Sequence, residues 1–254
     1  MKPSIPETLA PRLAPLDLDH RLLLVREFIP GRIVFTTSFG VEDQLIAHSI
    51  FTQGLDIDVV TIDTGRLFPE TYTLWEETEA RYARRIRAAY PQAAALEALV
   101  EEQGVNGFYK SAEARKACCH VRKVEPLSRL LAGVSGWITG LRADQSAARA
   151  EVPLIAFDAN YRVIKINPVL DYKREDIVAA TQEFSIPVNE LHAKGFLSVG
   201  CAPCTRAIEP GDHERAGRWW WEQDDKKECG LHVGEDGVLR RGPAPDSASP
   251  EVFE

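Results

Sequence analysis

Four of the five cysteines in this sequence form two pairs that lie far apart along the chain. Cys118 and Cys119 are adjacent, Cys201 and Cys204 form a CxxC pair, and Cys229 stands apart from both. An even set with one cysteine left over is the pattern expected of a four-thiolate metal site with a separate nucleophile. The alternative is a set of buried structural cysteines, but charged residues flank the first pair and polar residues the second. We therefore expect a fold that brings the two pairs to one metal centre.

The spacing of the first pair distinguishes between two kinds of metal centre. Structural zinc sites commonly use two C-x(2–4)-C motifs around one tetrahedral ion. Neighbouring side chains on a helix diverge by about 100°, so Cys118 and Cys119 are badly placed to share one zinc ion. A cubane offers a separate iron to each of four thiolates, and adjacent residues could each reach one. The spacing favours a [4Fe-4S] cluster with Cys118, Cys119, Cys201 and Cys204 as ligands.

The composition is that of an ordinary globular protein. The chain has 254 residues, enough for one or two domains with a sizeable core, and 44% of them are hydrophobic and 27% charged. The formal net charge of −8 argues against a nucleic-acid partner or an acidic membrane surface, but it allows a local cationic pocket. No apolar run reaches the roughly 18 residues of a bilayer span, and the first residues lack the apolar stretch of a signal peptide. We therefore expect a cytoplasmic protein. Thiols stay reduced in that compartment, so grouped cysteines indicate metal or redox chemistry more than structural disulfides.

Hydrophobic patterns predict strands and helices in alternation. Short β-branched runs predict strands over 32–37 and 57–62, and apolar residues at helical spacing predict a helix over 41–53 between them. Two parallel strands joined by a helix form a right-handed βαβ unit. Further helices are expected from Pro69 toward Arg84 and over 92–103, 106–131 and 173–184, and further strands over 86–90, 137–141 and 162–166. This alternation predicts an α/β fold, a Rossmann-like parallel sheet covered by helices on both faces.

The pattern changes after about residue 195. We expect an α/β domain over 1–195, followed over 196–234 by a loop with the CxxC pair and a charged segment that contains three adjacent tryptophans. Residues 235–254 are poor in apolar side chains and predict a flexible tail.

Polar segments follow three of the predicted strands, at residues 38–43, 63–65 and 140–149. In such sheets ligands bind at the carboxyl ends of strands near the point where the strand order reverses, so we expect all three segments to face one crevice. Neither GxxxxGK[ST] nor GxGxxG is present. The Ser38-Phe39-Gly40 turn instead offers helix N-terminal amides and a hydroxyl to an anion, although an ordinary helix cap fits the same residues.

Basic side chains in polar loops add weight to an anion site. Arg142 and Arg149 follow a predicted strand, and Arg215 and Arg218 lie in the segment before the lone cysteine. Guanidinium groups match the oxygens of sulfate and phosphate, and a loop position distinguishes these arginines from those that decorate a helix. His232 lies three residues after the lone cysteine, where an imidazolium would lower the pKa of the thiol and increase its thiolate fraction.

Several segments, taken in order, resemble the assimilatory adenylylsulfate (APS) and phosphoadenylylsulfate (PAPS) reductases: TTSFGVED, TIDTGRLFPETY, KACCHVRKVEPL, TGLRADQSAAR, INPVLDY, GFLSVGCAPCTR, ERAGRWWW and KECGLH. The resemblance implies an adenine-nucleotide-hydrolase-like α/β fold, with a nucleotide-binding domain and a mobile C-terminal segment that bears the nucleophilic cysteine. In this family the APS branch carries the CC and CxxC pairs, which bind a [4Fe-4S] cluster, whereas the PAPS-specific branch typically keeps only the last cysteine. The chain is thus similar to the APS branch.

The resemblance also implies a role for each residue that matches the family's motifs. Cys229 is the implied nucleophile, and the two pairs are the implied cluster ligands. The turn of Ser38, Phe39 and Gly40 belongs to the phosphate-binding loop, and the loop of Asp63, Thr64 and Gly65 lies near the adenosine. Lys123 lies near cluster and substrate, and the sulfate and phosphate site is lined by Arg149, Arg215, Arg218 and His232. We add Arg142 to the predicted substrate-binding residues because of its position in the same loop as Arg149.

The reaction that the resemblance implies is the reduction of adenosine 5′-phosphosulfate to sulfite and AMP, in sulfate assimilation and cysteine biosynthesis. The Cys229 thiolate attacks sulfur, AMP leaves, and an S-sulfocysteine forms on the enzyme. Thioredoxin, as in the family, then attacks this disulfide-like bond and releases sulfite. The sequence contains no flavin or nicotinamide signature, which fits an external dithiol as reductant, and a homo-oligomer is compatible with it.

Three other functions fit parts of the sequence. A PAPS reductase, or an enzyme that uses both nucleotides, differs in its relative turnover of APS and PAPS. A tRNA-thiolating ATP pyrophosphatase can also hold a cluster, but residues 38–43 lack the SGGxDS loop and the negative net charge disfavours tRNA. A zinc-stapled binding module is the non-catalytic alternative, which a brown iron–sulfur chromophore would exclude.

Overall fold

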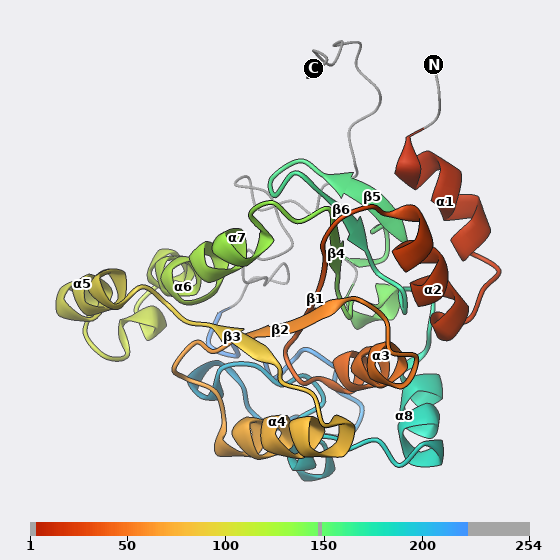
Figure 1. The fold of residues 1–254 in the computed structure, drawn as a ribbon. Coiled ribbons are helices and arrows are strands. Elements are labelled where there is room, and N and C mark those ends of the chain that lie inside the picture. Colours follow the sequence, from red (N-terminus) through yellow and green to blue (C-terminus); the bar gives the residue numbers. More distant parts are fainter. Residues whose placement is uncertain (1–3, 147–148, 223–254) are drawn as a thin grey trace, which may run out of the picture.

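The alternating pattern folds into a six-stranded sheet with the order β3-β2-β1-β4-β6-β5 (Figure 1). The computed structural model describes residues 4–146 and 149–222. Neighbouring strands are parallel, except that β5 runs antiparallel to β6. The predicted α/β class with a Rossmann-like sheet is confirmed. The strands are β1 (Ile33–Thr37), β2 (Asp58–Ile62), β3 (Arg87–Ala89), β4 (Gly136–Ile138), β5 (Ile155–Asp158) and β6 (Val163–Ile166).

The strand order reverses between β1 and β4, near the centre of the sheet. β1 pairs with β2 on one side, with Val34 opposite Asp58, and with β4 on the other, with Ile33 opposite Gly136. The chain therefore builds outward from β1 to β3 and then returns to the far side of β1. The carboxyl ends of β1 and β4 flank the position at which sheets of this kind bind their ligands.

Helices cover both faces of the sheet (Figure 1). One face, with Phe35 and Ile138, packs against α1, α2, α3, α4 and α8, and the other, with Val34 and Trp137, packs against α7. Side chains that alternate along β1 and β4 thus enter two separate cores, as strand geometry requires. The helices are α1 (Ile5–Leu13), α2 (Leu18–Phe28), α3 (Val41–Thr52), α4 (Pro69–Tyr82), α5 (Ala93–Gln103), α6 (Ala112–Cys119), α7 (Glu125–Leu131) and α8 (Arg174–Glu183).

Most predicted elements agree with the structure to within a few residues. The predicted helix over 41–53 is α3, and the helix predicted from Pro69 is α4. α4 ends at Tyr82 because Ala83, with φ 49°, adopts the left-handed conformation that terminates helices. α1, α2 and β5 lie outside the predicted set. β5 is a short edge strand whose Phe157 is largely exposed, so its hydrophobic pattern is weak.

The predicted continuous helix over 106–131 is wrong in detail, because the chain breaks it into separate pieces. A 3₁₀ turn, Gly107–Tyr109, precedes α6, and the hydroxyl of Ser111 caps α6 by accepting the amide of Ala114 at 3.1 Å. A π-helix, His120–Val124, separates α6 from α7. π-Helices are rare and occur frequently at functional sites. The tandem cysteines stand at this junction.

None of the helices within residues 4–146 and 149–222 combines the length and the apolar character that a bilayer crossing requires.

Candidate active site

A cavity opens at the carboxyl ends of β1, β2 and β4. The three polar segments that follow these strands do converge on it, joined by residues 197–200 and by side chains between 214 and 219. Of the predicted substrate-binding residues, Ser38, Phe39, Gly40, Thr64, Lys123, Arg149, Arg215 and Arg218 line this cavity. Asp63, Gly65 and Arg142 are not among the residues that line it. Cys229 and His232 lie outside the described residues.

The turn after β1 is held by a buried carboxylate. Asp43 Oδ2 accepts the amide of Ser38 at 2.6 Å and its hydroxyl at 2.8 Å. Burial raises the pKa of Asp43 to about 6, against the opposing effect of the bonds from Ser38. Phe39 has φ 61°, a strained conformation for a residue with a side chain, and its ring stacks on Trp75 in the core. The backbone of this turn therefore faces the cavity while the Phe39 ring anchors it.

Asp63 and Gly65 shape the loop that presents Thr64. Asp63 Oδ1 accepts the amide of Gly65 at 2.8 Å, and Gly65 has φ 69°, which favours glycine. The carbonyl of Thr64 accepts a bond from Arg122 Nη1 at 2.6 Å, and its hydroxyl oxygen lies 3.3 Å from Cys201 Sγ. This loop joins the cavity to the CxxC pair.

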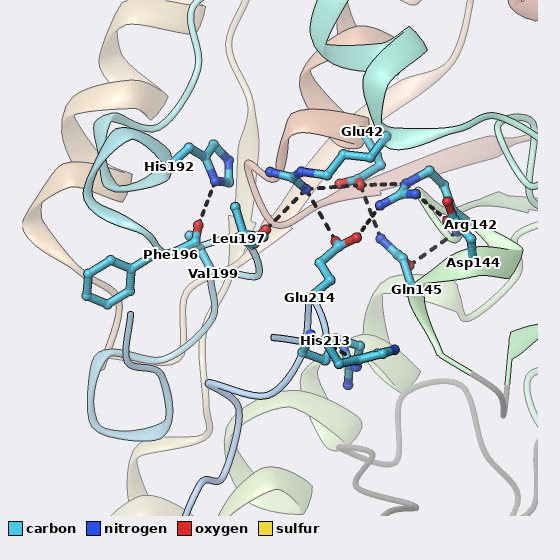
Figure 2. A network of polar contacts seen from close by, with 12 residues as sticks. Glu42, Arg142, Asp144, Gln145, His192, Phe196, Leu197, Val199, His213 and Glu214 are labelled. Carbon is cyan, nitrogen blue, oxygen red and sulfur yellow. Dashed lines mark hydrogen bonds and ion pairs between the residues drawn. The ribbon is translucent and has the colours of Figure 1, made fainter. Parts of the chain in front are cut away.

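Arg142 is buried beside the cavity, where three carboxylates surround its guanidinium group (Figure 2). Nε donates to Glu42 Oε1 at 2.8 Å, Nη2 donates to Glu214 Oε2 at 2.5 Å, and Nη1 donates to Asp144. Burial disfavours the charged form, but Glu42 and Glu214 outweigh it and raise the pKa of Arg142. The guanidinium group that was predicted to bind substrate is thus engaged within the protein.

Two of the arginines that line the cavity are themselves largely buried. Arg149 is 6% and Arg218 7% exposed. Arg149 Nη1 donates to Gln145 Oε1 at 2.5 Å. The guanidinium carbon of Arg218 lies 4.8 Å from the ring centroid of Trp219, and that of Arg215 lies 5.9 Å from it. Arg218 Nε is buried without a hydrogen-bond partner among the described residues. A buried donor of this kind is suited to an oxyanion.

Three of the four paired cysteines lie together next to the cavity. Cys118, Cys201 and Cys204 pack in one cluster with Trp219. Cys119 is the last residue of α6 and is buried. The amide of Trp219 donates to the carbonyl of Cys204 at 3.2 Å, which fixes the later segment against the CxxC pair. The fold therefore brings Cys118 to the CxxC pair, and a shared metal site that also includes Cys119 stays a prediction.

The thiols differ in how readily they ionise. Burial raises the pKa of Cys118, and it raises the pKa of Cys204 to about 12. Burial also opposes ionisation of Cys201, but the charges of Lys123 and Arg218 and the hydrogen bond with Thr64 outweigh it, so the pKa of Cys201 is lowered. A bound metal centre would supply the positive charge that the other thiolates need.

The residues around the thiols fit an iron–sulfur group. Within residues 4–146 and 149–222, no three His, Cys, Asp or Glu side chains are arranged as ligands of a single ion. A four-iron cluster takes one thiolate on each iron and does not require that arrangement. Trp219 Nε1 and Trp221 Nε1 are buried and have no hydrogen-bond partner in the part of the chain that the structure describes. Soft thiols beside cations and unpartnered N–H donors match the needs of an anionic, sulfur-rich group.

The sequence matches a known protein family over the whole sheet. The phosphoadenosine phosphosulfate reductase domain matches residues 32–207. The chain belongs to this family. The matched region runs from just before β1 to just beyond the CxxC pair.

Relatives of this reductase-family chain carry a more specific name. An adenosine 5′-phosphosulfate reductase of Sinorhizobium fredii (strain USDA 257) is 55% identical over 224 residues, which cover 88% of this chain and 89% of the relative. One from Allochromatium vinosum is 50% identical over 200 residues, which cover 79% and 78%. A chloroplastic 5′-adenylylsulfate reductase 3 of Arabidopsis thaliana is 40% identical over 240 residues, which cover 90% of this chain and 51% of the relative.

Solved structures share the fold. The PAPS reductase of Candida auris, in a phosphate complex, superposes with a TM-score of 0.68 at 24% identity and covers 82% of this chain and 99% of that one. Yeast FAD synthetase in complex with FAD superposes with a TM-score of 0.52 at 14% identity and covers 82% and 70%. The reductase family therefore shares its Rossmann-like sheet with enzymes of other chemistry.

Several residues that shape this reductase site were not singled out by the sequence: Glu42, Asp43, Gln145, Glu214 and Trp219. Glu42 and Glu214 are the partners of the buried Arg142, and Asp43 holds the turn at Ser38. Because an unpaired buried guanidinium group is very costly, an excess of arginines in loops that face a core is a signal to search for buried carboxylates.

Proposed function

We propose that this chain is an assimilatory APS reductase, which reduces adenosine 5′-phosphosulfate to sulfite and AMP. The observation that carries the proposal is the junction between cavity and thiols. Thr64, Lys123 and Arg218 line the cavity, and all three also lower the pKa of the Cys201 thiol. Relatives named adenosine 5′-phosphosulfate reductase, including one that is 55% identical, support the same reaction. We assign the reaction to the cytoplasm, where dithiol reductants are kept reduced.

The reaction begins with the thiolate of Cys229, which lies outside the described residues. The thiolate attacks the sulfur of APS, a sulfur–sulfur bond forms, the sulfur–oxygen bond to the phosphate breaks, and AMP leaves with the electron pair. A dithiol protein, thioredoxin, then attacks Cys229 Sγ and sulfite leaves. The second thiol of the dithiol resolves the mixed disulfide and releases Cys229. The dithiol thereby supplies both electrons and becomes a disulfide.

Positive charge in the cavity addresses the main electrostatic difficulty of this reaction. Thiolate, sulfate and phosphate are all negative, yet the sulfur atoms must come within bonding distance. Lys123, Arg149, Arg215 and Arg218 line the cavity, and cations aimed at the oxygens offset the repulsion and stabilise the charge that passes to AMP. The segment beyond residue 222 must bring Cys229, together with His232, to the cavity and afterwards expose the sulfocysteine to the dithiol.

Cys118, Cys119, Cys201 and Cys204 would hold a [4Fe-4S] cluster. When bound, the cluster supplies a fixed anionic centre that orders the two pairs, and it carries no electrons in turnover because the dithiol supplies them. The hydroxyl of Thr64 lies close enough to Cys201 Sγ, at 3.3 Å, to donate a hydrogen bond to it as a thiolate. Lys123 then extends from the π-helix toward both the thiols and the cavity.

The test is an assay of anaerobically purified protein with reduced thioredoxin. We expect sulfite and AMP from APS and much slower turnover of PAPS. Iron and acid-labile sulfide, but not zinc, should accompany the protein. Faster release of sulfite from PAPS would instead identify a PAPS reductase, and no sulfite from either nucleotide would refute the proposal.

Replacement of Asp43 by asparagine should change how AMP binding depends on pH. Burial raises the pKa of Asp43 to about 6, so the carboxylate is charged above that pH and repels the phosphate of AMP, and it is neutral below. Asparagine is neutral at every pH. We expect Asp43→Asn to bind AMP about tenfold more tightly than wild type at about pH 7.5 and equally at about pH 5. Calorimetry of both proteins gives a ratio of dissociation constants from which the titration of AMP itself cancels. A ratio that is constant with pH would exclude this role of Asp43.

Replacement of Gly200 by alanine should displace Arg218. A Cβ atom at Gly200 would lie 2.2 Å from Arg218 Nη2 and 2.5 Å from its Cζ. Because the guanidinium group must move, we expect AMP to bind about tenfold more weakly. The same alanine in an Arg218→Ala background should cause no additional loss, since the group that it displaces is gone. Additive losses would show that Gly200 acts by another route.

A further inference from the structure

Glu214 links the segment that carries two cavity arginines to the body of the protein. Its carboxylate bridges two guanidinium groups, with Oε2 accepting Arg142 Nη2 at 2.5 Å and Oε1 accepting Arg174 Nη1 at 3.3 Å. Figure 2 shows the side chain of Glu214 directed toward Arg142 and Glu42. Arg174 is the first residue of α8, and Arg142 follows β4. The bridge thus joins three parts of the chain that are distant in sequence.

Burial makes this bridge expensive to break. The exposed fractions are 0% for Arg142, 14% for Glu214 and 21% for Arg174. The removal of one partner from a buried ion pair leaves the other charge without compensation, which is strongly unfavourable. Arg142 is also held by Glu42, in the first turn of α3, so its position is fixed from the side of the sheet. Glu214 is therefore bound to a rigid partner.

The segment that follows Glu214 is irregular and has a second anchor at its other end. The amide of Arg206 donates to the carbonyl of Gly217 at 3.1 Å, and Thr205 and Arg218 form an isolated antiparallel bridge. The amide of Arg218 donates to the carbonyl of Arg215 at 2.9 Å, which closes a turn between these two residues. Arg215 lies between these two anchors and Arg218 is part of the second one, so the anchors determine where both side chains can reach.

The same network reaches a third cavity arginine from the opposite side. Gln145 Oε1 accepts the amide of Arg142 at 3.2 Å and Nη1 of Arg149 at 2.5 Å, while Gln145 Nε2 donates to Glu42 Oε1 at 3.2 Å. Arg142 therefore stands between Arg149 on one side and the Glu214 segment on the other. This arrangement explains why an arginine in a cavity-facing loop does not itself line the cavity.

We infer that Glu214 is a positioning residue: its bridge to Arg142 and Arg174 seats the segment 214–219 so that Arg215 and Arg218 face the cavity. The inference deepens the proposed function, on which its kinetic test rests. The charge of Glu214 is the essential property, because a neutral amide of the same size can still accept hydrogen bonds but cannot compensate two guanidinium groups.

The test compares Glu214→Gln with Glu209→Gln in the cluster-loaded full chain. Glu209 is an exposed carboxylate in the same stretch and serves as the matched control. We expect Glu214→Gln to raise KM for APS about tenfold with a smaller change in kcat, since arginines that contact the substrate become less well placed. Glu209→Gln should match the wild type.

Hydrogen–deuterium exchange tests the seating without reference to the reaction. In Glu214→Gln the amides of Arg206 and Arg218 should exchange about tenfold faster than in either the wild type or the control, while those of β1 stay unchanged. Unchanged exchange at Arg206 and Arg218 would overturn the inference, and faster exchange throughout the sheet would show a general loss of stability instead, which also overturns it. If the wild type reduces no APS, the proposed function fails, but the exchange result still decides the seating.

A milder variant separates the two halves of the bridge. Arg174→Gln removes one partner and leaves the contact with Arg142, so we expect a smaller rise in KM than in Glu214→Gln. The double variant should lose less than the sum of the two single losses, because both changes remove the same bridge. Arg174 also donates to the carbonyl of Leu197 at 3.3 Å, so a small additional loss is expected. Additive effects would contradict a shared role.

Discussion

Replacement of Cys229 by serine is expected to abolish the release of sulfite, by at least about 10⁴-fold, and to leave AMP binding within twofold or so of the wild type. The hydroxyl of serine is almost entirely protonated at neutral pH, so the attack on the sulfur of APS has no thiolate to carry it. The residues that line the described cavity are untouched by this change. The measurement is a single-turnover assay with APS, followed by mass spectrometry of the protein.

In the wild type without reductant, the same experiment should trap a sulfonate on Cys229 with one AMP released for each adduct. Addition of reduced thioredoxin should then release sulfite from the isolated adduct. An adduct on Cys118, Cys119, Cys201 or Cys204, or turnover by the serine variant, would contradict the assignment of the nucleophile.

Replacement of Cys201 by serine is expected to remove the iron instead. The pKa of Cys201 is lowered, since Lys123, Arg218 and the hydrogen bond with Thr64 outweigh its burial. Serine is a poor ligand for iron that favours soft sulfur donors. We expect iron to fall from about four atoms per chain to less than one, with loss of the visible absorbance and of sulfite release.

The two cysteine variants are controls for each other. Cys229→Ser should keep its full content of iron and sulfide while it loses turnover, and Cys201→Ser should lose both. Full iron in Cys201→Ser would show that the CxxC pair does not hold the cluster. A loss of iron in Cys229→Ser would show that Cys229 is needed to hold the cluster and would contradict its assignment as a separate nucleophile.

The local part of the fold follows from the sequence, because it depends on patterns within short windows. The βαβ unit from β1 through α3 to β2 is such a case, since its apolar residues repeat at strand and helix spacing. The convergence of three polar loops also follows, because the carboxyl ends of parallel strands share one edge of the sheet. β5 escapes prediction because, among the described residues, it pairs with β6 alone and lies at an edge, which gives it little burial pattern.

The assignment of Arg142 shows where the sequence does not suffice. A loop position after a strand suits equally an arginine that binds a substrate and one that holds the loops around it. The two cases differ in their partners, and Glu214, which neutralises Arg142, is 72 residues away along the chain. Its pairing depends on tertiary packing, so no local pattern could reveal it. The break in the predicted helix over 106–131 is a different case, because Ser111 caps α6 and is a local signal of a new helix start.

The π-helix at His120–Val124 lies between two helices, α6 and α7, whose side chains pack against different parts of the protein. Upstream, Cys118 packs against the CxxC pair, and downstream Leu127, Leu130 and Leu131 fill the second core beneath the sheet. Each added residue turns the direction of an α-helical side chain by about 100°. The wider turn of the π-helix therefore changes the direction in which the side chains of α7 point relative to those of α6. Excision of one residue there would put the leucines and the cysteines out of step, and only one of the two surfaces could remain properly aligned.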